Sequence, residues 1–250
     1  MTLSFRKPII LTRVNQDNKE FIRSFSALDP SVNVKDSFIF FPLYDIIFEK
    51  NLEENLDSDY LICTSRYGIH SIPYNSSVVG KTIFCVGETT AFLAKKIGFQ
   101  KIFYPKVGNA SNLVKLICAK VKDTRATLNY LRGKEVSHDL KKELKNFGYE
   151  VRETIVYRQK RIKLGQRMTN FIRKEKMGGV VFFSASVARA FCNEVKEFPQ
   201  DFLFFCISDR VAKEVKKNRM LDNDNIRIAP EPNTKQILNL IFNEKSIRPN

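Results

Sequence analysis

The sequence holds few of the residues from which metal sites and disulfide frameworks are built. Its two histidines, His70 and His138, have no other candidate ligands clustered around them, so we expect no metal site. No two cysteines form a CxxC pair, and each lies within an apolar segment. This pattern is typical of reduced core thiols in a cytoplasmic protein rather than of disulfides or ligands. The five cysteines are Cys63, Cys85, Cys118, Cys192 and Cys206.

Long apolar runs are also missing. No segment is apolar over the length that spans a bilayer, and the N-terminus lacks the hydrophobic region of a signal peptide. We therefore predict no membrane association and a cytoplasmic location. No GxGxxG motif follows any expected strand, which argues against a dinucleotide-dependent dehydrogenase.

Positive charge dominates what is present. The 42 Lys and Arg residues outnumber the 27 Asp and Glu residues, giving a net charge of +15, while an apolar fraction of 43% suffices for real cores. This charge favours anionic partners, although the alternative is that many lysines only solvate helix faces. A nucleic-acid-binding protein is a rival interpretation. Against it, the basic residues are spread over many segments and no RRM, KH or helix-turn-helix signature is present.

The stretch 83–91 predicts a strand that turns directly into a helix. Residues 83–86 are apolar on both alternating faces, as in a parallel strand covered on both sides. Gly87 permits a sharp turn, residues 88–90 offer capping groups, and the helix begins at Ala91. The free amides and the dipole of such a helix N-terminus favour an anionic ligand.

The rest of the chain alternates strands and helices, which predicts parallel sheets with helices on both faces. Residues 38–43 and 150–158 are expected to be extended. The predicted strands are 8–11, 60–63, 83–86, 101–104, 127–131, 180–183, 202–207 and 226–229. The predicted helices are 18–28, 66–72, 91–97, 109–121, 136–146, 166–174, 187–195, 210–217 and 235–242, with Gly98 and Gly148 as helix stops.

The order of these elements repeats, which indicates a duplicated α/β unit. Ser184 follows its strand as Thr64 does, and Ser208 follows its strand as Gly87 does; such equivalent positions are 119 to 121 residues apart. In parallel sheets, ligands bind outside the C-terminal ends of the strands. Two such rims that face each other would form a cleft suited to carboxylates or phosphates. The polar clusters at these strand ends are 12–13, 64–65, 87–90, 132–133, 184–186 and 208–210.

Several of these segments together resemble the uroporphyrinogen-III synthase family. The resemblance covers nearly the whole chain, and the order and spacing of the motifs are more specific than any single motif. The matching segments are ILTR at 10–13, CTSRYGI at 63–69, VGETTA at 86–91, LRG at 131–133 with Leu140, Leu144 and Gly148, VY at 156–157 and FFSAS at 182–186.

The resemblance implies two similar α/β domains joined by two extended linkers. One domain would combine about residues 1–37 and 159–250, and the inserted domain would span about 43–152. The linkers would be about 38–42 and 151–158. Hinged linkers would let a cleft open for substrate and product.

The resemblance also implies a function. Such a protein is a lyase of haem biosynthesis that cyclises hydroxymethylbilane to uroporphyrinogen III, with inversion of ring D and loss of water. The eight carboxylates of that substrate suit a basic protein, and no cofactor or metal is implied. We expect a monomer that does not bind nucleic acid, and a transient contact with the preceding pathway enzyme stays open. The alternative is a non-catalytic two-domain binding protein for a polyanionic small molecule.

The family match points to Tyr157 as a candidate general acid that assists the departing hydroxyl; the alternative is a tyrosine that only packs its ring. Every other candidate has a structural alternative, namely a helix cap for the hydroxyls and a salt bridge for the arginines. Arg132 is expected to be structural, and His70 and His138 to be surface or packing residues. The candidate substrate-binding residues are Arg13, Thr64, Ser65, Gly87, Thr89, Thr90, Ser184, Ser186 and Arg210.

The sequence departs from the family pattern at three places. Tyr67 stands where Asn is common, and Ala185 stands where Pro is common. The second copy of the strand-to-helix turn reads ISDRVA at 207–212, without the usual Gly and Thr. There Asp209 would repel a carboxylate, and Arg210 would attract one in place of a hydroxyl contact.

Overall fold

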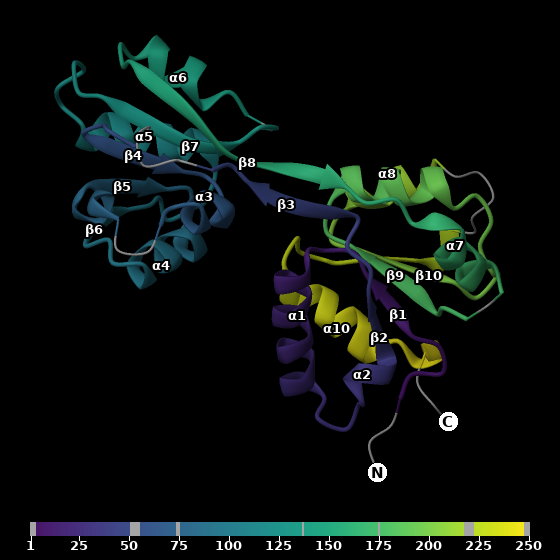
Figure 1. The fold of residues 1–250 in the computed structure, drawn as a ribbon. Helices are drawn as coiled ribbons and strands as arrows, with labels where there is room; N and C mark the ends of the chain where they lie inside the picture. The colour runs from purple at the N-terminus through teal and green to yellow at the C-terminus, as the bar shows by residue number, and fades with distance from the viewer. Residues whose placement is uncertain are drawn as a thin grey trace. The chain divides into compact units, whose positions relative to one another are not determined.

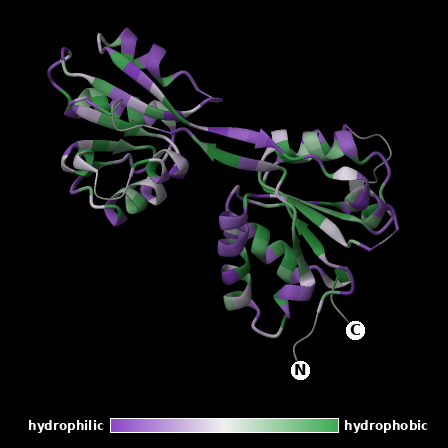
Figure 2. Ribbon diagram, viewed as in Figure 1, coloured by the Kyte–Doolittle hydropathy of each residue, from purple (hydrophilic) through white to green (hydrophobic). Residues whose placement is uncertain are grey.

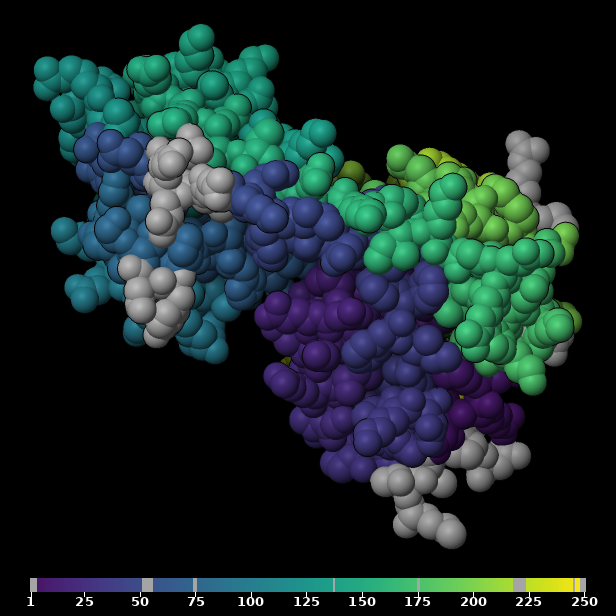
Figure 3. Space-filling view, in the orientation of Figure 1, coloured from purple at the N-terminus to yellow at the C-terminus, as the bar shows by residue number. Residues whose placement is uncertain are grey.

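The computed structural model describes residues 4–50, 56–73, 76–136, 138–174, 176–217 and 223–247. The chain forms two compact units (Figure 1). Unit 1 comprises Met1–Asp45 and Arg161–Asn250, and unit 2 comprises Ile46–Lys160. Figure 3 shows that purple atoms of the N-terminal segment pack beside green atoms from the later part of the chain in unit 1. No helix among the described residues is long and apolar enough to cross a membrane.

Unit 1 is a parallel sheet with the strand order β11-β10-β9-β1-β2. Its strands are β1 (Ile9–Leu11), β2 (Phe38–Phe40), β9 (Gly179–Phe182), β10 (Leu203–Cys206) and β11 (Ile226–Ile228). Its α-helices are α1 (Asn15–Leu28), α2 (Val34–Ser37), α7 (Gly165–Arg173), α8 (Ala185–Glu194), α9 (Asp209–Lys216) and α10 (Thr234–Asn243). Its described residues also form the short 3-10 helices η3 (Asn223–Asn225) and η4 (Lys245–Ile247).

The strands of unit 1 are apolar on both faces because helices cover both faces. In β1, Ile10 packs into one core with residues of α8 and α9, whereas Ile9 and Leu11 pack into the opposite core with α1 and α10. Figure 2 shows the contrast: β1 is green, whereas α1 carries purple, hydrophilic residues. Burying one such aliphatic side chain contributes roughly 1.5–3 kcal/mol, which is why these runs select the sheet interior.

Unit 2 is a sheet with the strand order β3-β8-β7-β4-β5-β6, parallel from β8 to β6. Its strands are β3 (Tyr44–Phe48), β4 (Tyr60–Cys63), β5 (Thr82–Cys85), β6 (Lys101–Phe103), β7 (Leu128–Gly133) and β8 (Val151–Arg161). The first residues of β3 and the last residue of β8 belong to unit 1, so these two strands carry the chain from one unit to the other. Its helices are α3 (Arg66–His70), the 3-10 helix η2 (Ser77–Gly80), α4 (Glu88–Lys96), α5 (Ala110–Lys120) and α6 (Leu140–Asn146). Helices α3 and α4 cover one face, and α5 and α6 cover the other.

The two sheets share one strand order. Matching β9, β10 and β11 with β4, β5 and β6 also matches β1 and β2 with β7 and β8. The predicted fold class, two similar α/β units with one of them discontinuous, is therefore confirmed. The structure corrects the residue alignment by one position, because Ser184 begins α8 as the N-cap in the way that Ser65 begins α3. Ser184 thus corresponds to Ser65 rather than to Thr64.

Some elements differ from the prediction. Strand β3 was not predicted; its residues lie beside β8, and Glu49 N donates to Val156 O at 3.0 Å. The helix predicted over 136–146 begins only at Leu140, because the side chain of Asp139 accepts a hydrogen bond from Lys142 N; Ser137 lies outside the described residues. Of the stretches expected to link the domains, 38–42 begins with β2 of the unit 1 sheet, and 151–158 pairs with β7 from Val151 to Tyr157.

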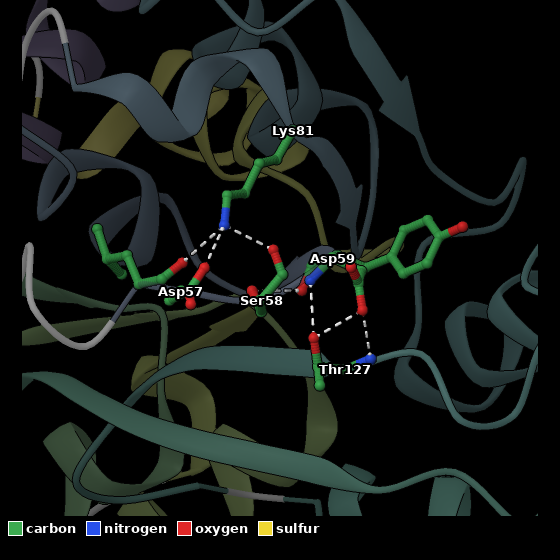
Figure 4. Close-up of polar contacts among 7 residues, drawn as sticks. Asp57, Ser58, Asp59, Lys81 and Thr127 are labelled. Carbon is green, nitrogen blue, oxygen red and sulfur yellow. Dashed lines mark hydrogen bonds and ion pairs between the residues drawn. The ribbon is translucent and has the colours of Figure 1, made fainter.

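The strand starts of unit 2 are held together by a polar cluster (Figure 4). Thr127 N donates to Asp59 Oδ2 at 2.8 Å, and Asp59 N donates to Thr127 Oγ1 at 2.9 Å. Lys81 Nζ donates to Ser58 O at 2.7 Å and pairs with Asp57. The hydrogen bonds from the Thr127 backbone and side chain lower the pKa of Asp59. They therefore stabilise the fold above the usual titration range of an aspartate, and this stabilisation is lost as the pH falls through the lowered pKa.

Candidate functional site

A pocket of about 250 Å³ lies in unit 2 at the C-terminal ends of its central strands. Parallel strands end at one edge of the sheet, so β4, β5 and β7 deliver their following residues to the same place. Hydroxyls gather there from Thr64 and Ser65 after β4, from Tyr130 in β7 and from Tyr157 in β8. The full lining is Thr64, Ser65, Val86, Ala110, Tyr130, Gly133, Glu135, Val136, His138, Leu140 and Tyr157.

Tyr157 is the most enclosed of the predicted hydroxyl residues that line this pocket, with 8% of its surface exposed. The rings of Tyr157 and Tyr67 pack edge to face, with their centroids 5.4 Å apart. Burial raises the pKa of the Tyr157 hydroxyl above its usual value of 10, a hydrogen bond with the Ser65 side chain opposes this, and the negative charge of Glu135 adds to it. The hydroxyl therefore stays protonated at neutral pH and is able to donate a proton.

Ser65 and Thr64 occupy different local roles. Ser65 is the N-cap of α3, where its hydroxyl accepts a hydrogen bond from Tyr67 N at 3.2 Å. The hydroxyls of Thr64 and Tyr130 share a hydrogen bond of 2.7 Å across the β4–β7 pair. Burial raises the pKa of Tyr130 too. Both roles fit a rim of neutral donors, which is able to bind a carboxylate without burying a counter-charge.

The strand-to-helix turn that the sequence singled out has a different basis from the one predicted. Gly87 is the N-cap of α4 with φ −174°, an extended conformation that any residue adopts, so the turn itself does not require glycine. Val86 lines the pocket, Thr89 is exposed, and Thr90 is buried in the first turn of α4. The space limit falls instead on Gly108, where an added Cβ would come 3.1 Å from Val86 O.

The predicted residues of unit 1 lie on its own rim. The Arg13 guanidinium forms an ion pair with Asp17 at 2.7 Å and lies 4.5 Å from the centroid of the Phe183 ring. The hydroxyls of Ser184 and Ser186 share a hydrogen bond of 2.8 Å at the start of α8. Arg210 is exposed in the first turn of α9. Arg13 differs from the other three residues because its charge is already paired.

Sequence reasoning missed three residues that line the pocket. Tyr130, Glu135 and His138 line the pocket, and His138 Nε2 lies 3.1 Å from Glu143 Oε1. Tyr130 was hidden in an apolar strand, and only the register that sets Cys63 beside Leu131 brings its hydroxyl to Thr64. Arg132, expected to be structural, lies 2.8 Å from Glu153 and donates to the carbonyls of residues 133 and 134.

All five cysteines are free thiols, and four of them are buried. Burial raises the pKa of Cys85 to about 12, which suppresses the reactive thiolate. Within the described ranges, His, Cys, Asp and Glu nowhere form a group of three that would hold a metal ion.

Comparisons with known proteins agree with this architecture. A family model described as uroporphyrinogen-III synthase HemD matches residues 37–239. The fold is similar to that of a uroporphyrinogen-III synthetase from Helicobacter pylori, with a TM-score of 0.65 and 19% identity over 94% of this chain and 98% of that one. It is also similar to a mutant uroporphyrinogen III synthase from Thermus thermophilus, with a TM-score of 0.55 and 13% identity over 94% of this chain and 100% of that one. A search of curated protein sequences finds no match.

Proposed function

We propose that this chain, which belongs to the uroporphyrinogen-III synthase family, converts hydroxymethylbilane to uroporphyrinogen III. The family match over residues 37–239 carries the proposal, and the hydroxyl-lined pocket of unit 2 supports it. The reaction would make the protein a hydro-lyase of tetrapyrrole synthesis. We propose that it acts as a monomer in the cytoplasm.

In this proposal Tyr157 is the general acid. Its hydroxyl donates a proton to the hydroxymethyl oxygen of the substrate, the carbon–oxygen bond breaks, and water leaves. The electron pair of the pyrrole stabilises the resulting azafulvenium cation, and the substituted carbon of ring D attacks it to form a spiro intermediate. Fragmentation and reclosure invert ring D. A proton lost from the final ring carbon restores the aromatic pyrrole and returns to Tyr157, so that one water is released overall.

The main contribution of the protein would be geometric. The linear substrate closes unaided to the wrong isomer, so the rim must hold the chain with the substituted carbon near the electrophile. A pocket of about 250 Å³ has the volume of about eight waters, which suits one ring with its acid arms rather than the whole tetrapyrrole. We assign that ring to the hydroxyls of Thr64, Ser65 and Tyr157.

Other carboxylates of the substrate would bind elsewhere. In unit 2, the amides at the start of α4, from Gly87 to Thr90, are a natural anion contact for a second arm. In unit 1, we propose Ser184, Ser186 and Arg210 as contacts, since their polar groups are accessible. Arg13 would have to share its guanidinium with Asp17 in order to bind a carboxylate.

The test is to supply hydroxymethylbilane to the purified protein and to separate uroporphyrinogen isomers I and III after oxidation. Rapid formation of isomer III, with isomer I suppressed below its spontaneous yield, is the expected result. Saturable binding of hydroxymethylbilane without a change in the isomer ratio would instead support the non-catalytic binding protein. Heat-denatured protein supplies the spontaneous baseline.

A further inference from the structure

At the end of β7, the space that a side chain on Gly133 would need is already occupied by another residue. A Cβ built on Gly133 would lie 2.7 Å from both Cε2 and Cζ of Tyr157 and 2.9 Å from its hydroxyl oxygen. Real Cβ atoms essentially never approach other heavy atoms within 3.0 Å. The backbone does not demand glycine, because Gly133 is not among the described glycines with positive φ, which are Gly98, Gly148 and Gly165. The requirement for glycine therefore comes from the phenol of Tyr157.

The backbone places these two residues side by side. The register of the β7–β8 pair shifts between Arg132 and Gly133, so that Gly133 stands opposite Tyr157 instead of Val156. Lys134 N then donates to Tyr157 O at 2.9 Å. This irregularity turns the Tyr157 ring over the α-carbon of Gly133, where any side chain would meet it.

The remaining sides of the phenol are also held. The Tyr67 ring contacts it edge-on at a centroid distance of 5.4 Å, and the Ser65 side chain bonds to its hydroxyl. Gly133, Ser65 and Tyr157 all line the same pocket, so the position of this ring decides where the hydroxyl points within it. Because tyrosine is a rigid side chain with few rotamers, a shift at the ring moves the hydroxyl with it.

We propose that Gly133 is a positioning residue that aims the Tyr157 hydroxyl into the pocket. Its missing side chain provides the space in which the phenol lies against β7. This inference rests on the proposed acid role of Tyr157. A methyl group at position 133 would displace the ring rather than the strand, since the ring is a side-chain end and β7 is fixed by its pairing with both β4 and β8.

The first test is kinetic and uses Gly133→Ala. We expect a fall in kcat of about 10²-fold with a small change in KM, as for a catalytic group displaced by about 1 Å. Gly80→Ala is the matched control, because a Cβ there would meet nothing within 4 Å. In the Tyr157→Phe background, Gly133→Ala should cost less than about 2-fold, since residues that act through one group are not additive. A full additional loss in that background would overturn the proposal.

The second test does not depend on activity. With tyrosines labelled by ¹³C at Cζ, the Tyr157 resonance is identified by its loss in Tyr157→Phe. Gly133→Ala should shift that resonance and bring the pKa of Tyr157 back toward its ordinary value, whereas Gly80→Ala should leave both unchanged. An unmoved Tyr157 resonance in folded Gly133→Ala protein would overturn the proposal. If Tyr157→Phe turns over normally, the acid role fails, while this measurement still decides whether Gly133 positions the ring.

Discussion

The two units share a strand order but end their central strands differently. Aligning the N-caps Ser65 and Ser184 sets Thr64 of unit 2 against Phe183 of unit 1. The strand registers then set Tyr130 against Leu11. A hydroxyl pair at 2.7 Å in unit 2 thus corresponds to two apolar side chains in unit 1. The two units therefore share the arrangement of the sheet but differ in the residues of the rim.

Arg13 makes a second difference between the two rims. In unit 1 the Arg13 guanidinium covers the Phe183 ring and pairs with Asp17, which closes that part of the rim. In unit 2 the corresponding place is a pocket lined by Thr64 and Tyr157. These differences support the proposal that proton transfer belongs to unit 2 and that unit 1 contributes charge and hydroxyl contacts for carboxylates.

The largest effect is expected from a substitution of Tyr157, the proposed acid of unit 2. Tyr157→Phe removes the proposed acid and should lower kcat for isomer III by about 10²–10⁴-fold while far-ultraviolet circular dichroism stays unchanged. Because burial raises the pKa of Tyr157 above 10, the wild-type rate should show no loss from this group as the pH rises from about 7 to about 9. Near-normal turnover by the variant would refute the acid role.

Tyr130→Phe tests the hydroxyl pair that unit 1 lacks. It leaves the partly buried Thr64 hydroxyl without its partner, so we expect a loss of about 1–3 kcal/mol in the free energy of unfolding, measured by urea denaturation. The matched control is Thr64→Val with Tyr130→Phe, which removes both hydroxyls. It should cost less than the sum of the two single changes, and strict additivity would show that the pair is not coupled.

Arg210→Gln sharpens the role assigned to unit 1. Loss of one exposed charge contact should raise KM for hydroxymethylbilane by roughly 5-fold at low salt, with kcat unchanged, and the difference should shrink at about 0.5 M salt. Arg13→Gln serves as the comparison, because Arg13 is paired with Asp17 and its loss should mainly lower the thermal midpoint. An unchanged KM for Arg210→Gln at low salt would remove that residue from the binding surface.

The smallest effect concerns the thiols and leaves activity intact. Cys118 is partly exposed on α5, whereas Cys192 and Cys206 of unit 1 are buried with pKa values raised to about 12. A thiol reagent should therefore modify Cys118 first in the folded protein. Peptide mapping by mass spectrometry reads the order, and early labelling at Cys206 would show that unit 1 opens more readily than its packing indicates.

Local sequence signals predicted much of the fold. Capping residues and glycines marked real boundaries, as at Asn109, whose side chain caps α5, and at Gly98 and Gly148, which adopt positive φ after α4 and α6. Strand β3, with the sequence YDIIF, escaped prediction because none of its five residues is buried. Its apolar residues neither alternate strictly with polar ones nor form an uninterrupted run, which are the two patterns that identify a strand.

The sequence predicted those site residues that a local feature marks. Residues directly after a strand, such as Thr64 and Ser65, were recognisable because a strand end is a local feature. Tyr130 and the role of Gly133 depend on which residue stands opposite them in the neighbouring strand, and a register shift at Gly133 decides this. His138 was expected within a helix. Because α6 begins only at Leu140, His138 lies before the helix and lines the pocket.

The asymmetry between the rims is tested most directly by removing one hydroxyl from each N-cap. Ser65→Ala and Ser184→Ala change equivalent positions, but Ser65 bonds to the Tyr157 hydroxyl, whereas Ser184 bonds to Ser186. The account predicts that Ser65→Ala lowers kcat for isomer III at saturating hydroxymethylbilane, whereas Ser184→Ala changes only KM. A loss of kcat in Ser184→Ala equal to or larger than that in Ser65→Ala would contradict it.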